Sequence, residues 1–153
     1  MKTLKRLCAP SLCRVVVAAC LFGIAWPAPA EPLQLDERST VAVWPAVTLL
    51  ADPDGSFGAA ELAGQPERFK APTGVSGNLG RRDEIIWLRA SFIVPETPEL
   101  HRVLAIDYPA LNEIDLYLLR NGRVQSHQRM GNLLHPKERA MPSRAHAAAL
   151  PAA

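Results

Sequence analysis

The sequence is poor in cysteine, and its three cysteines all lie near one end. They are Cys8, Cys13 and Cys20, so the chain beyond residue 20 can form no disulfide and no cysteine-based metal site. Aromatic residues make up only 6% of the chain, and no basic run is interleaved with them. Nucleic-acid binding therefore has no support. After residue 30 we find no apolar run approaching the roughly 20 residues of a membrane-spanning helix.

The sequence also lacks the spacings that accompany catalysis or metal binding. Its four histidines show no metal-ligand spacing and no H-E-x-x-H pattern, so we expect no metal and no other cofactor. The glycines of residues 74–80 do not have the spacing of a phosphate-binding loop. Residues 74–78 (GVSGN) approach the G-x-S-x-G nucleophile elbow, but Asn78 replaces its second glycine. We therefore do not expect the chain to be an enzyme. A secreted hydrolase with Ser76 as its nucleophile is the weakest of the three functional hypotheses; the other two are given at the end of this section.

The first thirty residues have the pattern of a secretory signal peptide. Four Lys and Arg residues precede a mostly apolar stretch at 15–26, and Ala28-Pro29-Ala30 offers a cleavage site. We expect cleavage after Ala30, a polar lead-in at 31–39, and an exported, periplasmic domain at 40–153. Removing the signal leaves 13 Lys and Arg against 15 Asp and Glu. The positive charge of the whole chain therefore belongs to the signal peptide.

The mature chain is organised around residues 84–120, where hydrophobicity alternates with a period of two. In 84–94 the even positions are all apolar from Ile86 onward and the odd positions are mixed, which predicts a strand with its even side buried. Prolines at 95 and 98 interrupt it. The runs 102–108 and 114–119 alternate in the same way. We predict three successive strands of one antiparallel sheet.

Weaker signals flank these strands. We predict an edge strand, broken by Pro45, at residues 40–50 and a turn at residues 52–55 (DPDG). We also predict one helical turn at residues 59–63 and a short strand at residues 67–71. Residues 72–82 should be a loop. Asn121-Gly122 predicts a type I′ hairpin returning into a strand at 124–130. Residues 133–144 look irregular, and 145–153 show no period and no terminal strand. Five or six short strands predict an all-β sandwich.

Several short motifs follow one another along residues 41–150 in a recognisable order. They are Trp87-Leu88-Arg89, Asp107-Tyr108-Pro109, Ile114-Asp115-Leu116-Tyr117, Gly122, Gly131-Asn132-Leu133-Leu134, Arg139 and Arg144, preceded by residues 50–55 and Phe69. In this order they resemble a known family, the type 2 extracellular sensor domain of bacterial seven-transmembrane receptors with diverse intracellular signalling modules.

The resemblance implies a jelly-roll-like antiparallel β-sandwich, similar to carbohydrate-binding modules, that binds a small molecule or carbohydrate. In a full-length relative the domain would precede seven membrane helices and a cytoplasmic diguanylate cyclase or histidine kinase. The chain ends where the last strands of the sandwich are expected, so we expect a C-terminally incomplete domain, a fragment or a truncated product. The family often has Gly-Asp where this chain has Gly131-Asn132.

The candidate ligand contacts each have a structural alternative. The ring of Trp87 suits the apolar face of a sugar but could equally pack in the sandwich. Arg89 could bind a ligand or pair with Asp107 or Asp115. The remaining candidates are Tyr108 and Tyr117, which could be core residues, and Arg139 and Arg144, which could be solvated loop charges.

Our first hypothesis is a non-catalytic, periplasmic ligand-sensing domain of a transmembrane signalling receptor. The alternative is a free-standing exported carbohydrate-binding or adhesion protein, which would need a complete sandwich and an exposed aromatic row.

Overall fold

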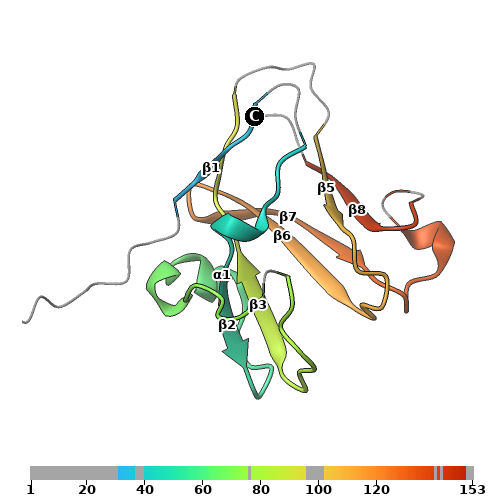
Figure 1. Cartoon of the computed structure of the whole chain (residues 1–153), viewed down its shortest axis with the longest axis horizontal. Helices are drawn as coiled ribbons and strands as arrows, with labels where there is room; N and C mark the ends of the chain where they lie inside the picture. The colour runs from blue at the N-terminus through green and yellow to red at the C-terminus, as the bar shows by residue number, and fades with distance from the viewer. Residues whose placement is uncertain are drawn as a thin grey trace, which may run out of the picture.

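The fold is known from a computed structural model, which describes residues 31–36, 40–75, 77–95, 102–139, 141 and 143–150. The proposed signal peptide lies outside these residues. The described part is almost entirely β-structure with one short α-helix, so the predicted all-β class is confirmed (Figure 1). The strands are β1 (Leu33–Gln34), β2 (Thr48–Asp52), β3 (Ile85–Arg89), β4 (Phe92–Ile93), β5 (Arg102–Ile106), β6 (Ile114–Arg120), β7 (Arg123–Met130) and β8 (His146–Leu150). The helical elements are α1 (Ala59–Ala63) and the 3-10 turns η1 (Trp44–Ala46), η2 (Pro66–Arg68) and η3 (Pro136–Glu138).

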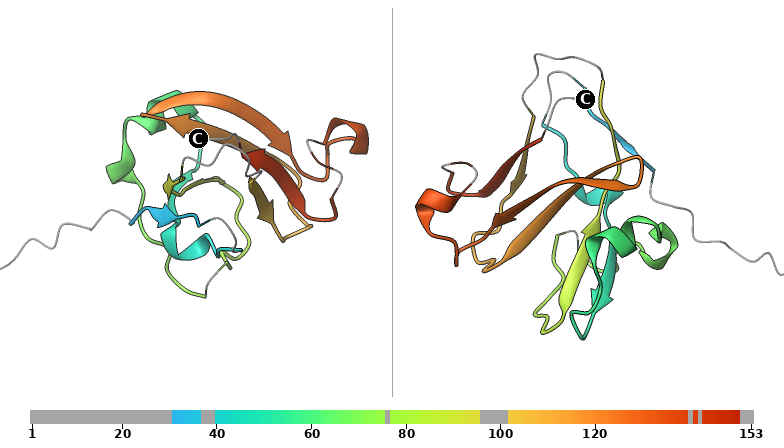
Figure 2. Two further views of the ribbon diagram at one scale, coloured as in Figure 1. Left: turned by 90° about the horizontal axis from the view of Figure 1, so that it is seen from above. Right: turned by 180° about the vertical axis from the view of Figure 1, so that it is seen from behind.

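The described strands associate in pairs. β2 pairs with β3, β5 with β8 and β6 with β7, all antiparallel, while β1 and β4 pair in parallel. Figures 1 and 2 show β6–β7 and β5–β8 together on one side of the molecule and β1–β4 and β2–β3 on the other. This arrangement is consistent with a β-sandwich, and the jelly-roll connectivity stays a prediction.

The expected pairing of three successive strands is wrong. β3, β5 and β6 all exist, but each pairs with a different partner strand. One reason is β8, which the sequence did not reveal: residues 145–153 were expected to contain no strand. Of its five residues, three are alanines, so they give no alternation of large apolar and polar side chains from which a strand could be read.

Two segments before β3 also differ from expectation. Pro45 lies in η1, and β2 begins only at Thr48, because proline has no N–H to give to a ladder. Residues 67–71 do not form a strand. η2 occupies their start, and only Lys70 pairs with Leu49, through two backbone hydrogen bonds of 2.8 and 2.9 Å.

The two clearest turn signals are confirmed. Gly55, in the turn after β2, has φ +62°. Asn121 and Gly122 have φ +54° and +72°, as a type I′ hairpin requires. The helical turn at Ala59–Ala63 also forms where expected and ends at Gly64. Residues 72–82 form a loop in their described part.

The buried core of the described residues is small and consists mostly of small side chains. The buried apolar residues are Ala46, Val47, Leu62, Ala63, Met130, Ala147 and Ala148. The prediction that the even side of β3 is buried is wrong at Leu88, which is 51% exposed. On the odd side Trp87 and Arg89 are half-buried, because Asp52 at the end of β2 and the last turn of α1 provide their polar partners.

Candidate functional site

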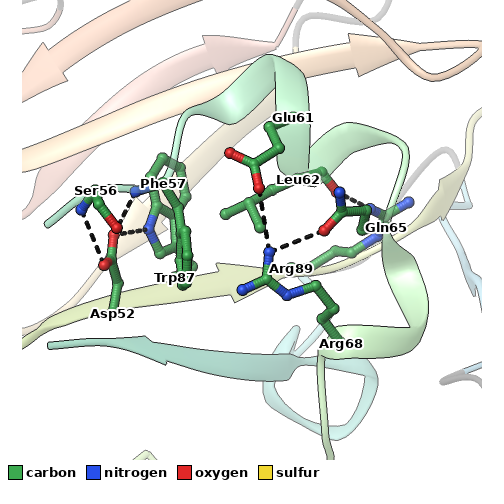
Figure 3. A network of polar contacts seen from close by, with 9 residues as sticks. All are labelled: Asp52, Ser56, Phe57, Glu61, Leu62, Gln65, Arg68, Trp87 and Arg89. Atoms are coloured by element: carbon green, nitrogen blue, oxygen red, sulfur yellow. Dashed lines mark hydrogen bonds and ion pairs between the residues drawn. The ribbon is translucent and has the colours of Figure 1, made fainter. Parts of the chain in front are cut away.

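Asp52, at the end of β2, anchors the turn that follows it. The residue is 1% exposed, and its carboxylate accepts hydrogen bonds from the Ser56 N–H (3.0 Å), the Phe57 N–H (3.1 Å) and the Trp87 indole N–H (3.2 Å) (Figure 3). Burial by itself raises the pKa of Asp52. The donors outweigh it and hold this pKa below its ordinary value. Asp52 thereby fixes the indole of Trp87 in one orientation.

Arg89 lies two residues further along β3 and is bound to the end of α1. Its Nη1 donates to the carbonyl oxygens of Leu62 (3.3 Å) and Ala63 (3.5 Å) in the last turn of α1, where the Leu62 oxygen also accepts from the Gln65 N–H at 3.2 Å. Its guanidinium also lies 5.7 Å from the centre of the Phe69 ring. Of the two alternatives for Arg89, the pairing with Asp107 or Asp115 is wrong, since β3 pairs with β2, whereas Asp115 lies in β6 and Asp107 follows β5.

A second arginine secures α1 to the same region. The Nη1 of Arg68 contacts the Glu61 carboxylate at 3.3 Å and the Gln65 side-chain oxygen at 2.8 Å, as Figure 3 shows. Its guanidinium lies 4.1 Å from the centre of the Phe57 ring. Arg68 thus ties α1 to the turn η2 that follows it, while Arg89 joins the end of α1 to β3.

Three rings form what we call the aromatic row: Trp87, Tyr117 and His127. The Trp87 and Tyr117 rings are 5.9 Å apart with planes tilted by 31°, and the Tyr117 and His127 rings are stacked 4.4 Å apart at 5°. Cross-strand pairing of Tyr117 on β6 with His127 on β7 creates the stack. The row runs from half-buried Trp87 to His127, whose side chain is 41% exposed.

Charged groups continue the row at its exposed end. The His127 Nε2 lies 2.6 Å from the Asp115 carboxylate, and the Arg129 Nε lies 3.8 Å from the same carboxylate. Arg129 Nη2 also approaches Glu113 at 4.0 Å. Exposed pairs of this kind contribute only about 0–1 kcal/mol each to stability. They do place carboxylate and guanidinium groups beside aromatic rings.

The six predicted ligand contacts do not form one cluster. Trp87 and Tyr117 belong to the aromatic row, and Arg89 is engaged with α1. Tyr108, just after β5, is 60% exposed. Arg139 follows η3 and is half-buried, while Arg144 is exposed before β8. No hydrogen bond, ion pair or ring contact joins these last three residues to the row within the described ranges. Their role in ligand contact stays a prediction.

The sequence patterns did not identify His127 and Asp115 as members of a candidate site. The Asn121-Gly122 turn predicts a hairpin register in which Tyr117 would face Ser126. A register shift between Leu118 and Leu119 places Tyr117 opposite His127 instead. No signal in the sequence indicates that shift, so the stacked pair could not have been found by counting from the turn.

The other chemistry considered for this chain gains no structural support. In the described part of the chain, no group of three or more His, Cys, Asp or Glu residues could hold a metal ion. Ser76, the proposed hydrolase nucleophile, lies outside the described residues. No helix among those that the structure describes has the length and apolar content to span a membrane.

The described residues form a small all-β domain in which the aromatic row joins β3, β6 and β7. A comparison with protein-family models identifies it further: the model described as 7TMR-DISM extracellular 2 matches residues 45–153. The match covers well over half of the chain, and the protein belongs to this family of extracellular sensor domains from seven-transmembrane receptors. No curated protein matches the chain.

Proposed function

We propose that this chain is a non-catalytic, periplasmic ligand-sensing domain of a bacterial transmembrane signalling receptor, with a small carbohydrate as the class of ligand. Membership of an extracellular sensor family supports the sensing role. The observation that carries the ligand class is the aromatic row, with rings 5.9 and 4.4 Å apart that end at the exposed His127–Asp115 pair.

The row and its charged neighbours match the chemistry of a sugar. A pyranose has an apolar face of C–H groups that packs on aromatic rings. Its hydroxyls need both donors and acceptors nearby. Asp115 supplies acceptors and Arg129 supplies donors beside His127. Because Trp87 is fixed by Asp52 and Tyr117 by strand pairing, the rings are already in place, which lowers the entropic cost of binding.

Export is the second part of the proposal. Residues 1–30 would direct secretion and be removed after Ala30. In the full receptor, membrane helices and a cytoplasmic signalling domain, a diguanylate cyclase or a histidine kinase, would then be the partners. A reporter enzyme that folds only where disulfides form tests the location when fused after Ala153. We expect activity with the whole chain and none when residues 2–30 are deleted; equal activity of both fusions would contradict export.

Binding is tested by isothermal titration calorimetry of the purified protein with neutral mono- and oligosaccharides. The variant His127→Ala removes the exposed end of the row, and we expect it to weaken binding about three- to tenfold, the range of a lost stacking contact. The matched control is Gln125→Ala, an exposed β7 residue outside the row. Affinities that are equal in both variants, or absence of binding to every sugar, would contradict the proposed site.

A further inference from the structure

A small cavity lies away from the aromatic row, where β7 ends and β8 begins. Its wall consists of Met130, Gly131, Arg139, Met141 and residues 145–147. Its enclosed volume is about 10 Å³. That interior can hold one water molecule or one oxygen atom of a larger molecule. In Figure 1 this region connects the orange end of β7 to the red strand β8.

Two polar nitrogens of the cavity residues are buried without a partner. His146 is only 7% exposed, and its Nε2 has no hydrogen-bond partner in the structure. The Nε of Arg139 is likewise buried and without a partner. A buried donor without an acceptor destabilises the folded state, and more so when it is charged. Among the described residues the Nη1 and Nη2 of Arg102 are also buried without a partner, but Arg139 and His146 are the two such residues that share one cavity wall, and we look for an explanation that satisfies both.

The chemistry of these nitrogens defines what would satisfy them. A guanidinium stays charged at any physiological pH and offers only donors. The imidazole of His146 can donate from Nε2 in one tautomer or when protonated. No acidic residue is among the seven that form the cavity wall. The missing group is therefore an oxygen acceptor, and one that carries negative charge best matches the positive charge of the half-buried Arg139 guanidinium.

The fold holds both residues in place. His146 begins β8 and is paired with Ile106 of β5. Gly131, at the end of β7, packs so closely on Asn112 that a Cβ would lie 2.1 Å from its carbonyl oxygen. The floor of the cavity is thus fixed by strand pairing, while Arg139 comes from the segment after η3. Met130 and Met141 add an apolar wall.

We propose that this cavity is a binding site for the carboxylate of a small organic acid, with one oxygen accepting from Arg139 Nε and His146 Nε2. The apolar wall would contact the carbon next to the carboxylate. The site is distinct from the aromatic row and does not depend on the function proposed for it.

The test is an NMR titration of isotope-labelled protein that follows the Arg139 Nε–H and His146 ring signals. Sodium acetate supplies the carboxylate alone, glucuronate supplies it on a sugar, and glucose and sodium chloride are the negative controls. We expect saturable shifts of both signals with acetate and glucuronate and none with glucose. Tighter binding of glucuronate would identify an acidic sugar, and equal affinities would identify the carboxylate alone.

Two cavity variants and one control variant decide whether the cavity is responsible. Arg139→Gln should weaken acetate binding at least about tenfold, as expected for a lost charge-assisted hydrogen bond. Arg123→Gln makes the same charge change at the other end of β7, about 23 Å away, and should leave the affinity unchanged. His146→Gln should also weaken binding. If the His146→Gln variant does not fold, the affinity of the Arg139→Gln variant alone decides whether the cavity binds acetate, because Arg139 is half-exposed.

Three results would overturn the proposal. One is a linear shift without saturation, which means that the cavity holds only an ordered water molecule. The second is an equal response to sodium chloride. The third is an equal loss of affinity in Arg123→Gln, which indicates diffuse charge attraction.

Discussion

Replacing Gly131 by alanine is predicted to be among the most damaging small changes to this fold. Gly131 has φ +121°, a backbone conformation that side chains with a Cβ rarely adopt. Holding alanine there costs about 1–3 kcal/mol. The new Cβ would also lie 2.1 Å from the Asn112 carbonyl oxygen and 2.6 Å from its carbon, so one of the two segments must move.

The movement would break contacts that join residues 109–113 to the end of β7. The Asn132 N–H donates to Leu111 O at 3.0 Å and the Leu133 N–H to Asn112 O at 3.1 Å. The Asn132 side-chain amide also donates to Pro109 O. Each backbone bond contributes about 1 kcal/mol. Together with the strain, we expect Gly131→Ala to lower the free energy of unfolding by about 2–4 kcal/mol.

Urea denaturation followed by circular dichroism measures this loss, and two other glycines separate its causes. Gly122 has φ +72° with open space around it. Gly122→Ala should therefore lower the free energy of unfolding only by the backbone strain of an alanine at positive φ, about 1–2 kcal/mol. Gly64 has φ −86° and ordinary contacts, so Gly64→Ala should cost nothing or stabilise by about 0.4–1 kcal/mol. If Gly131→Ala costs no more than Gly122→Ala, the close approach to Asn112 is not a real constraint.

Three further predictions concern the core, the Asp52 network and β8. Leu62→Ala should lower the free energy of unfolding, measured by urea denaturation, by about 2–4 kcal/mol, since this residue of α1 is 3% exposed. A decrease of less than about 1 kcal/mol would show that α1 does not pack as described. Because the folded pKa of Asp52 is lowered, the stability it contributes is present above its unfolded pKa near 4 and is lost as pH falls through the folded value. The stability gap between wild type and Asp52→Asn should therefore narrow below about pH 4, and a pH-independent gap would refute this linkage. Ala148→Leu should lower the free energy of unfolding by about 1–3 kcal/mol through overpacking, because Ala148 is fully buried. Ala149→Leu, on the exposed side of β8, should change it by less than about 0.5 kcal/mol. Equal effects of the two substitutions would mean that β8 does not pack as described.

Local chemistry made several elements of this fold predictable. The Asn121-Gly122 pair defines its hairpin because both residues adopt positive φ at little cost. The alternation in 102–108 and 114–119 correctly separates half-buried Leu104 and Leu116 from exposed Val103 and Asp115. These features depend only on residues close together in the sequence.

The parts that the sequence did not predict depend on partners far along the chain. β8 becomes a strand because β5 offers it a ladder, and its alanines carry no pattern of their own. Trp87 and Arg89 face inward because Asp52 and α1 supply partners. The stacking of Tyr117 on His127 depends on a register shift inside the hairpin.

The most direct test of the sensing account maps ligand-induced NMR shifts over the whole protein as neutral sugars are added. We predict a saturable response centred on the Trp87 indole N–H and the Tyr117 and His127 rings, with little change at the turn residues Asn121 and Gly122. A saturable response centred away from the aromatic row, or no saturable response to any sugar, would contradict the account.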